Sequence, residues 1–569
     1  MNTASRMETT STRGRIQVSQ DTADLLVAAG KSHWISRRDE LVFAKGKGEM
    51  QTYWLNIGQS AASTVSGGSI NHSESDDFFE DISEEQLNKQ SRLVDWNVEV
   101  LRKLLKQIAA RREFRALDAS RAGSSIETSK DLVYKRDSDK TILDEVSEVI
   151  ALPKFDSKAA KRERNPNNIK LGQDVESQLH NYVRSIACMY RENPFHNFEH
   201  VSHVVMSVTK LLSRIVAPAA EVVSDGQKKA APSRKKKSGD KDIDRFMNTI
   251  AHDAIGSYVG KHKTTTTTKK KLHDHTYGIT SDPLTQFACV FSALIHDVDH
   301  SGVPNTQLAK EQPVLASMYK EKSVAEQVSV DLAWNLLMED SYSALRNAIF
   351  QNHSELYRFR KLVVNSVMAT DVMDKDLKEL RNARWAKAFS EARPPTTKEQ
   401  HRELTNRKAT IVIEHIIQAS DVSHTMQHWH VYREWNEKLF REMSYAYHEG
   451  RAETDPATFW YKGEIGFFDF YIIPLARKLK DCGVFGVSSS EYLNYALMNR
   501  KEWELKGQAV VEEMVENFRK EMEERESKKA PVPAPMEEST REEDNVNISA
   551  VEQIATEGRS NEDDERCFL

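Results

Sequence analysis

Helical periodicity dominates the chain from about Leu171 to Glu524. Apolar residues there recur three and four positions apart, whereas the alternation typical of half-buried strands is scarce. Segments 175–190, 201–215 and 409–417 follow this helical pattern. The periodicity therefore predicts a mostly α fold, with one large all-helical domain over residues 171–524.

The composition excludes several broad classes. The 569 residues suggest about two to four domains. With 80 basic and 86 acidic residues, the net charge of −6 gives no general attraction to nucleic acid or to an anionic membrane. The longest apolar runs, such as Phe287–Ile295, fall short of the ~20 residues that span a bilayer. Four cysteines fit a reducing compartment, so we expect a cytoplasmic location, or the cytoplasmic part of a longer membrane-bound protein.

Shifts in composition divide the rest of the chain. Residues 1–57 contain short strand and helix patterns, and residues 58–170 begin with a Ser/Gly/Asn-rich stretch typical of a linker. Inside the helical domain, residues 217–275 carry lysine and threonine runs that indicate a mobile surface insertion. Residues 525–569 are acidic and contain a proline-rich stretch, which predicts a disordered tail.

A predicted helix over 83–114 has an apolar seam. Its five members are spaced 4-3-4-3, the a/d spacing of a two-stranded coiled coil: Val94, Val98, Leu101, Leu105 and Ile108. The seam could pair two chains into a homodimer, or it could belong to an amphipathic helix that packs on its own domain. The sequence leaves both interpretations open.

Histidines and aspartates recur in two segments at helical spacing. His196 and His200 lie four apart in FHNFEHVSH, and His296, Asp297 and His300 lie in HDVDHSGVPN. Residues four apart share one face of a helix, so each segment can direct side chains into one site. A third segment could deliver another carboxylate, because Asp421 follows the apolar helix IVIEHIIQAS.

These residue types suit a metal centre. Two neutral imidazoles and two carboxylates match the ligand preferences of Zn²⁺, and one carboxylate could bridge to a second ion such as Mg²⁺. Two such ions can hold a hydroxide and clamp a phosphate, which predicts a metal-dependent phosphohydrolase. Similar dipeptides at His252-Asp253 and His273-Asp274-His275 lie in the polar insertion, and we expect them to bind no catalytic metal.

Six stretches resemble one known family, and they occur in that family's order. They are FHNFEHVSHV, ACVFSALIHDVDHSGVPN, SVAEQ, VMATD, SDVSH and GFFDFYIIPL. The region from about 171 to 522 is similar to the catalytic domain of class I 3′,5′-cyclic nucleotide phosphodiesterases. This resemblance implies an all-α fold and hydrolysis of cAMP, cGMP or both to 5′-monophosphates in cyclic nucleotide signalling.

The resemblance also implies a role for each matching residue. The ligands of the first metal, implied to be Zn²⁺, would be His200, His296, Asp297 and Asp421. Asp297 would bridge to a second ion, Mg²⁺ or Mn²⁺, and His196 would be the general acid that protonates the leaving 3′ oxygen. His300 and Glu326 match a pair that hydrogen-bonds around the bridging water, and Thr370 and Asp371 match a segment near the second ion's waters. Phe467 matches the ring that stacks on the purine.

Two positions depart from the family pattern. Glu464 stands where the family has a glutamine that can pair with the purine edge. An ionised glutamate only accepts hydrogen bonds, which favours adenine weakly, whereas a protonated one could donate to guanine. Gln327-Val328-Ser329 stand where the family often has histidines.

The N-terminal stretch resembles a second family. NTASRMETT and KGKGEMQTYWL are similar to the last part of a class III nucleotide cyclase domain, with Asn2, Arg6 and Lys45 at that family's catalytic and polyphosphate-contacting positions. The family's metal-binding aspartates have no counterpart in these 57 residues. We therefore expect a cyclase fragment that forms no cyclic nucleotide from ATP or GTP.

Two other functions remain open at the level of sequence. The chain could be a different HD-type phosphohydrolase that acts on linear nucleotides, although the Phe467 segment argues against this. It could also be a non-catalytic module that only binds nucleotide, in which Glu464 would mark a decayed site.

Overall fold

The computed structural model describes residues 11, 16–28, 35–38, 41–44, 48–55, 84–122, 132, 134–137, 139–162, 165–215, 266–390 and 394–529. The chain folds as two compact units, Met1–Ser91 and Arg92–Leu569. The candidate cyclase residues Asn2, Arg6 and Lys45 lie outside the described residues, as do most of the expected insertion and tail.

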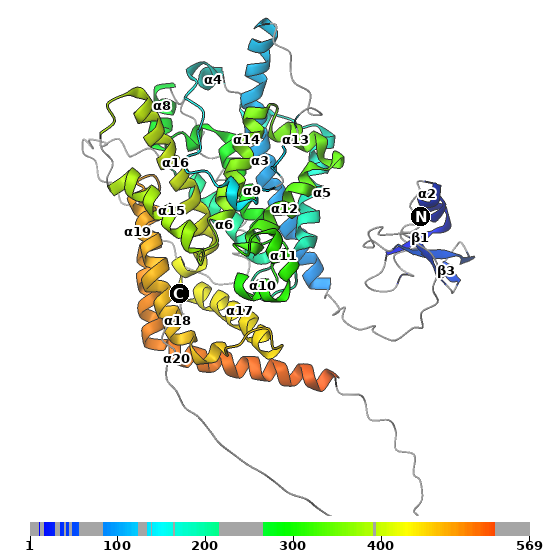
Figure 1. The fold of residues 1–569 in the computed structure, drawn as a ribbon. Helices are drawn as coiled ribbons and strands as arrows, with labels where there is room; N and C mark the ends of the chain where they lie inside the picture. The colour runs from blue at the N-terminus through cyan, green and yellow to red at the C-terminus, as the bar shows by residue number, and fades with distance from the viewer. Residues whose placement is uncertain are drawn as a thin grey trace, which may run out of the picture. The chain divides into compact units, whose positions relative to one another are not determined.

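The first unit is a small sheet structure (Figure 1). Strands β1 (Ile16–Ser19) and β2 (Ile35–Arg37) both pair antiparallel with β5 (Thr52–Leu55), in the order β1-β5-β2. A separate hairpin joins β3 (Val42–Ala44) to β4 (Gly48–Met50). The short helix α2 (Gln20–Ala28) follows β1 and buries Ala23.

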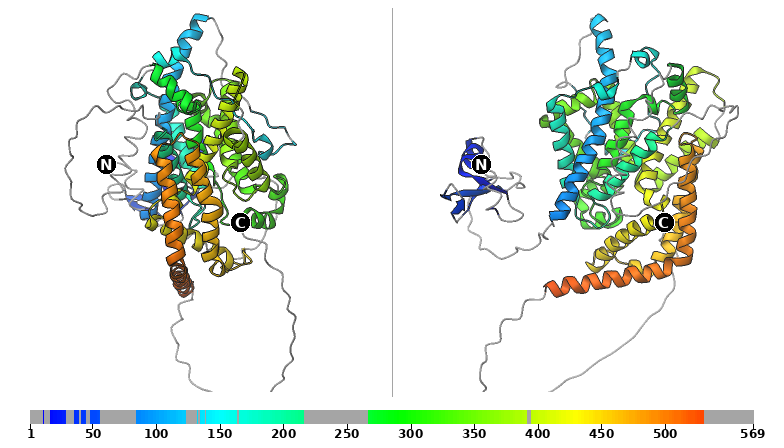
Figure 2. Two further views of the ribbon diagram at one scale, coloured as in Figure 1. Left: turned by 90° about the vertical axis from the view of Figure 1, so that its left-hand side faces the viewer. Right: turned by 180° about the vertical axis from the view of Figure 1, so that it is seen from behind.

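The second unit is helical in its described part, as the periodicity predicts (Figures 1 and 2). Its α-helices in the first half of the unit are α3 (Glu84–Ala122), α4 (Ser157–Arg162), α5 (Gln173–Met189), α6 (Phe198–Ser213), α8 (Thr266–His275), α9 (Pro283–Ile295), α10 (Asn305–Glu311), α11 (Pro313–Met318) and α12 (Val324–Met338). Those in the second half are α13 (Ser343–Ile349), α14 (His353–Met368), α15 (Lys375–Trp385), α16 (Lys398–Asp421), α17 (Trp429–His448), α18 (Trp460–Phe467), α19 (Ile473–Asp481) and α20 (Val487–Lys529).

Helix α9 forms the centre of this unit. Every residue from Pro283 to Ile295 except Gln286 is buried, because its sequence is apolar on all sides. Helices α6, α14 and α16 pack around it. The carboxyl end of α9 and the amino end of α6 carry the two histidine motifs, so packing against this central helix brings them into one region.

The seam of α3 packs on its own domain. Its members Val98, Leu101 and Leu105 are 2%, 1% and 0% exposed and belong to the same hydrophobic core as α6 and α9. At the other end of the packed stretch, Arg112 donates to three backbone carbonyls and to Glu355. This packing agrees with the interpretation of α3 as an amphipathic helix that packs on its own domain (Figure 2).

The predicted domain boundary at residue 171 needs correction. The core begins at Val94, and residues 139–152, which include a short 3-10 helix at Leu143–Glu145, run across the helices as a largely irregular strap. Paired side chains hold this strap: Arg360 binds Glu145 through two nitrogens, and Asn365 bonds both the amide and the carbonyl of Ser147. Residues 92–170, expected to belong to a linker, therefore contribute to the core.

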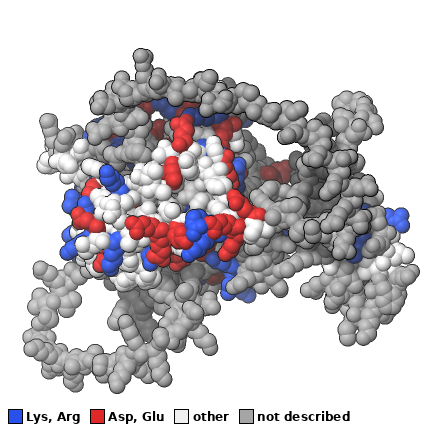
Figure 3. Space-filling model, turned by 90° about the horizontal axis from the view of Figure 1, so that it is seen from below, with Lys and Arg blue, Asp and Glu red and all other residues white. Residues whose placement is uncertain are grey.

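Smaller corrections concern the insertion and the tail. The last ten residues of the expected insertion form helix α8, in which the Lys269 ammonium group donates to the carbonyl of Ala160. Residues 525–529 continue α20. Along α20 and its neighbours, acidic and basic side chains lie side by side, as the pair Arg519–Glu516 does, and Figure 3 shows such mixed charges on one face. Among the described residues, no helix is long and apolar enough to cross a membrane.

Candidate metal centre

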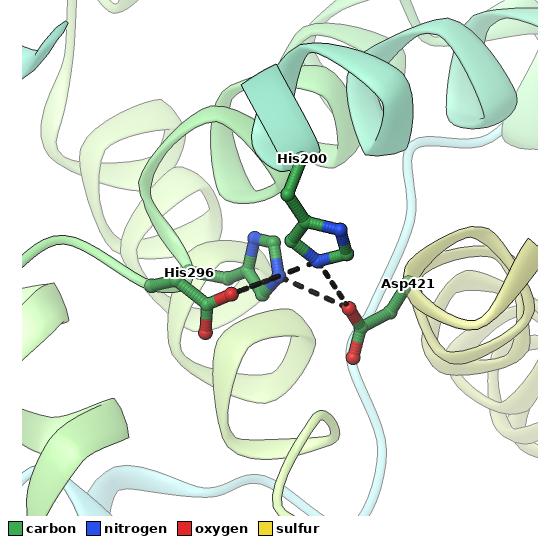
Figure 4. Close-up of side chains that lie close together, drawn as sticks. His200, His296 and Asp421 are labelled. Carbon is green, nitrogen blue, oxygen red and sulfur yellow. Dashed lines mark hydrogen bonds and ion pairs between the residues drawn. The ribbon is translucent and has the colours of Figure 1, made fainter. Parts of the chain in front are cut away.

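Three helices deliver four ligand groups to one point. His200 lies in the first turn of α6, whose N-cap residue Asn197 accepts hydrogen bonds from the amides of Glu199 and His200. His296 and Asp297 follow the end of α9, and Asp421 is the last residue of α16. Figure 4 shows His200, His296 and Asp421 converging from these different elements. The sequence motifs predicted this grouping, and the structure brings all four residues together.

The distances fit a single metal ion. Asp421 Oδ1 lies 3.1 Å from His200 Nε2 and 3.3 Å from His296 Nε2, and Asp297 Oδ2 lies 3.8 Å and 3.1 Å from the same two nitrogens. For metal–ligand bonds of about 2.0–2.2 Å, neighbouring ligand atoms lie about 3.3–3.6 Å apart in a tetrahedron and about 2.8–3.1 Å apart in an octahedron. Three of the four distances lie in or near these ranges and the distance from His200 to Asp297 is slightly longer, so the four groups are close enough together to bind one divalent cation.

His196 lies beside this cluster and is held by a carboxylate that the sequence motifs did not predict. Its Nδ1 is hydrogen-bonded to Glu442 Oε1, and Glu442 Oε2 accepts from the amides of Phe195 and His196 at 2.8 and 2.9 Å. Burial opposes the charged imidazolium, but the charge of Glu442 and this hydrogen bond raise the pKa of His196 to about 9. His196 is therefore protonated at neutral pH.

The second group of predicted residues is arranged around Asn305. The Asn305 side chain donates to Glu326 Oε2 at 2.9 Å and lies 3.5 Å from Asp371 Oδ2. Burial and the charge of Asp371 raise the pKa of Glu326 to about 8. Thr370, next to Asp371, donates its hydroxyl to the carbonyl of Val367. Glu326, Thr370 and Asp371 thus lie in one polar region, and the sequence had not singled out Asn305.

His300 contacts His196 instead of Glu326. The two imidazole rings lie 3.9 Å apart between centroids, and His300 Nδ1 accepts from the amide of Gly302. Burial and the charge of His196 lower the pKa of His300 to about 4, so it is neutral beside a charged ring. Within the described residues, His300 and Glu326 make no direct hydrogen bond, and their predicted arrangement around a bridging water stays a prediction.

The altered segment after Glu326 has a structural role. Gln327 is fully buried, accepts from the amide of Leu143 in the strap and donates to the carbonyls of Tyr319 and Lys322. Ser329 donates to the carbonyl of Val298. Gln327 and Ser329 therefore hold the strap and α12 together. Although they differ from the family pattern, the candidate ligands still converge.

Glu464 and Phe467 share one face of α18. Glu464 is 8% exposed, and its Oε2 accepts from the hydroxyl of Tyr432 at 2.6 Å. Phe467 stacks on Tyr471 with ring centroids 5.4 Å apart; burial raises the pKa of Tyr471, and the charge of Asp421 adds to this shift. Phe467 thus stacks on a tyrosine whose pKa responds to the charge of a candidate metal ligand.

The predicted decoys lie elsewhere. Nδ1 of His273 is hydrogen-bonded to the hydroxyl of Ser281, and no group of potential ligands found among the described residues includes His273, Asp274 or His275. His252 and Asp253 lie outside the described residues.

The site has the composition of a metal-dependent hydrolase of phosphate esters: four convergent ligands beside a protonated imidazole. Comparison with known proteins narrows this class. Residues 262–484 match the family model of the 3′5′-cyclic nucleotide phosphodiesterases, and residues 1–57 match the adenylate and guanylate cyclase catalytic domain. Residues 262–484 are therefore similar to a cyclic nucleotide phosphodiesterase domain, and residues 1–57 to a stretch of cyclase sequence.

Curated relatives agree with this match. "Probable 3′,5′-cyclic-AMP phosphodiesterase pde-4" of Caenorhabditis elegans is 26% identical over 205 residues, which cover 34% of this chain and 29% of that protein. The mouse dual specificity calcium/calmodulin-dependent 3′,5′-cyclic nucleotide phosphodiesterase 1B is 25% identical over 205 residues, or 34% of each chain. The chain thus matches about a third of the length of these relatives.

A solved structure gives a weaker match. The phosphodiesterase domain of the rhodopsin phosphodiesterase from the choanoflagellate Salpingoeca rosetta is 16% identical, with a TM-score of 0.41. The match covers 69% of this chain and 99% of that one.

Proposed function

We propose that the helical unit hydrolyses a 3′,5′-cyclic nucleotide, cAMP or cGMP, to its 5′-monophosphate. The observation that carries the proposal is the convergence of His200, His296, Asp297 and Asp421 beside the protonated His196, in a chain that contains a phosphodiesterase domain. Two divalent ions, Zn²⁺ at this cluster and Mg²⁺ or Mn²⁺ beside it, would neutralise phosphate charge and activate a water.

His196 acts as the general acid in this proposal. When the bond between phosphorus and the 3′ oxygen breaks, that oxygen becomes an alkoxide that needs a proton. His196 holds one at neutral pH, and Glu442 keeps the ring oriented and stabilises its charged form. Such help is typically worth about 10²–10⁴-fold in rate.

The remaining site residues bind and position. Phe467 would stack on the base, and Glu464 would contact its edge. Glu326, Asp371 and Asn305 would order water around the second ion, since their polar groups already form one hydrogen-bonded region. Thr370 adjoins this region. His300 would support His196 through ring contact.

Turnover assays test the proposal directly. The purified chain with Mg²⁺ should convert cAMP, cGMP or both to the 5′-monophosphate, whereas His196→Ala should keep its metal and lose turnover. A cyclic substrate with a better leaving group should be partly rescued, because it needs less protonation. Hydrolysis of linear nucleotides alone would favour the HD-type alternative, and nucleotide binding without any hydrolysis would favour a non-catalytic module.

The cellular location and the oligomeric state of the protein are also proposals. A cytoplasmic location is supported by the small number of cysteines, three of which are free in the described part of the chain. A homodimer through 83–114 has less support, because the seam that would pair the chains is buried within one chain.

A further inference from the structure

The carboxyl group of Glu464 is held by a single hydrogen bond. The Tyr432 hydroxyl donates to Oε2 at 2.6 Å, and both side chains are buried. In the described part of the chain, Oε1 makes no hydrogen bond. Phe467 lies three residues further along α18, on the same face, and stacks on Tyr471. One oxygen of the carboxyl group is thus anchored, and the other has no hydrogen-bonding partner among the described residues.

Anchoring has a different consequence for a carboxyl group than for an amide. An amide has a donor end and an acceptor end, so fixing one end fixes the character of the other. The two oxygens of a carboxyl group are equivalent, and the free one accepts when the group is ionised and donates when it is protonated. With Oε2 occupied by the Tyr432 hydroxyl, the acidic proton has Oε1 as its open position.

We propose that Tyr432 and Glu464 form a base-reading pair in which the presence of a proton on Glu464 sets the choice between guanine and adenine. This inference rests on the proposed function. An ionised Oε1 accepts from the N6 amino group of adenine but opposes O6 of guanine, whereas a protonated Oε1 donates to O6.

The surroundings of Glu464 place this change within an accessible pH range. Burial raises the pKa of Glu464 to about 7, against the opposing effect of the Tyr432 hydrogen bond. On the adjoining elements, Arg500 of α20 donates to Asp469, just after α18, and to Glu504, and these pairs lie on the exposed surface. Lys462 on α18 is exposed and makes no ion pair with Glu464 in the described residues.

The test is the ratio of kcat/KM for cGMP to that for cAMP, measured from about pH 5.5 to about pH 8.5. Ionisations that affect both substrates alike, such as that of His196, cancel in this ratio. We expect the ratio to fall with rising pH by roughly 5- to 150-fold, the effect of one unpaired buried polar group. In Glu464→Gln, which cannot ionise, the ratio should not change with pH.

Removing the Tyr432 hydroxyl tests the direction in which its hydrogen bond shifts the pKa of Glu464. The hydrogen bond from Tyr432 lowers the pKa of Glu464, so Tyr432→Phe should move the midpoint of the ratio to higher pH. Tyr461→Phe is the matched control, because the Tyr461 hydroxyl donates to a backbone carbonyl of α20 and not to Glu464. This control should leave the midpoint where it is in the wild type.

The outcomes separate the inference from the function on which it rests. Hydrolysis of neither nucleotide would overturn the proposed function. Hydrolysis with a ratio that is flat across the pH range, or with the same slope in Glu464→Gln, would overturn the base-reading pair alone. A midpoint that stays unchanged in Tyr432→Phe would remove Tyr432 from the pair.

Discussion

At the scale of single residues, the candidate ligands act as one unit. Removing any one leaves too few groups to hold the ion tightly, so His200→Ala, His296→Ala and Asp421→Ala should each lose both tight metal binding and activity. Metal analysis of the purified variants alongside turnover checks this. One tightly bound zinc retained in all three variants would contradict the ligand assignment.

Glu442 offers a prediction with a definite sign. Its charge raises the pKa of His196 to about 9, so the general acid is lost only as the pH rises through that value. Glu442→Gln removes the charge, and burial then lowers the pKa of His196. The alkaline limb of the pH–rate profile should therefore move to lower pH, with the metal content unchanged. A profile shifted to higher pH would be incompatible with this pairing.

The buried carboxyl group of Glu464 also affects stability. Its pKa of about 7 in the folded protein exceeds the ordinary glutamate value of 4.5, so between these values the unfolded state has lost the proton that the folded state keeps. The free energy of unfolding should fall as pH rises through this window, by up to ~3 kcal/mol. Glu464→Gln should flatten that slope, which denaturant titrations at several pH values would measure. An unchanged slope would mean that Glu464 is ionised throughout.

The sequence predicted which residues group together because their motifs combine fixed spacing with apolar helices, and the structure brings them together. The assignment of His200 and Asp421 as metal ligands comes from the resemblance to a known family and stays a prediction. Glu442, Asn305 and Tyr432 could not be predicted from the sequence, because each acts through a contact with a residue distant in sequence and stands in no motif of its own. Glu442 lies 246 residues from His196, for example. Such partners follow only from the way the helices pack.

At the scale of elements, α3 shows what periodicity leaves undecided. Its 4-3-4-3 spacing defines an apolar stripe but not the surface that covers it. In the structure the stripe is buried by other helices of the same chain. The same ambiguity explains why the domain boundary was predicted too late in the chain. A helix that packs on core residues far along the chain has the same sequence pattern as a helix that lies outside the domain.

This packing predicts a large cost for truncating the α3 stripe. Leu105 is 0% exposed, so Leu105→Ala should lower the free energy of unfolding by about 2–5 kcal/mol. Leu505→Ala is the control on another helix: Leu505 is 71% exposed, and its truncation should change stability by no more than about 0.5 kcal/mol. A Leu105→Ala effect that depends on protein concentration would instead indicate pairing of two chains.

At the scale of the whole molecule, the metal centre and the cyclase-like sequence lie in different units. Every described residue of the metal centre lies in the second unit. A chain that lacks residues 1–83 but keeps all of α3 should therefore retain metal content and kcat/KM within about twofold, since surface or distant changes seldom alter a preformed site. A further truncation to residue 160 should unfold the domain, because it removes α3 and the strap. Equal activity of both truncated chains would show that neither element supports the site.

The clamp between Arg112 and Glu355 has a consequence for biogenesis. These two residues are 243 positions apart, and Arg112 also needs the carbonyls at the end of α13. At about 5–20 residues per second, a ribosome takes roughly 12–50 s to add the intervening chain. Throughout that interval the apolar stripe of α3 has been synthesised but lacks the α14 side of its clamp. Until α13 and α14 have been synthesised, the Arg112 end of α3 therefore lacks the partners that fix it in the folded domain.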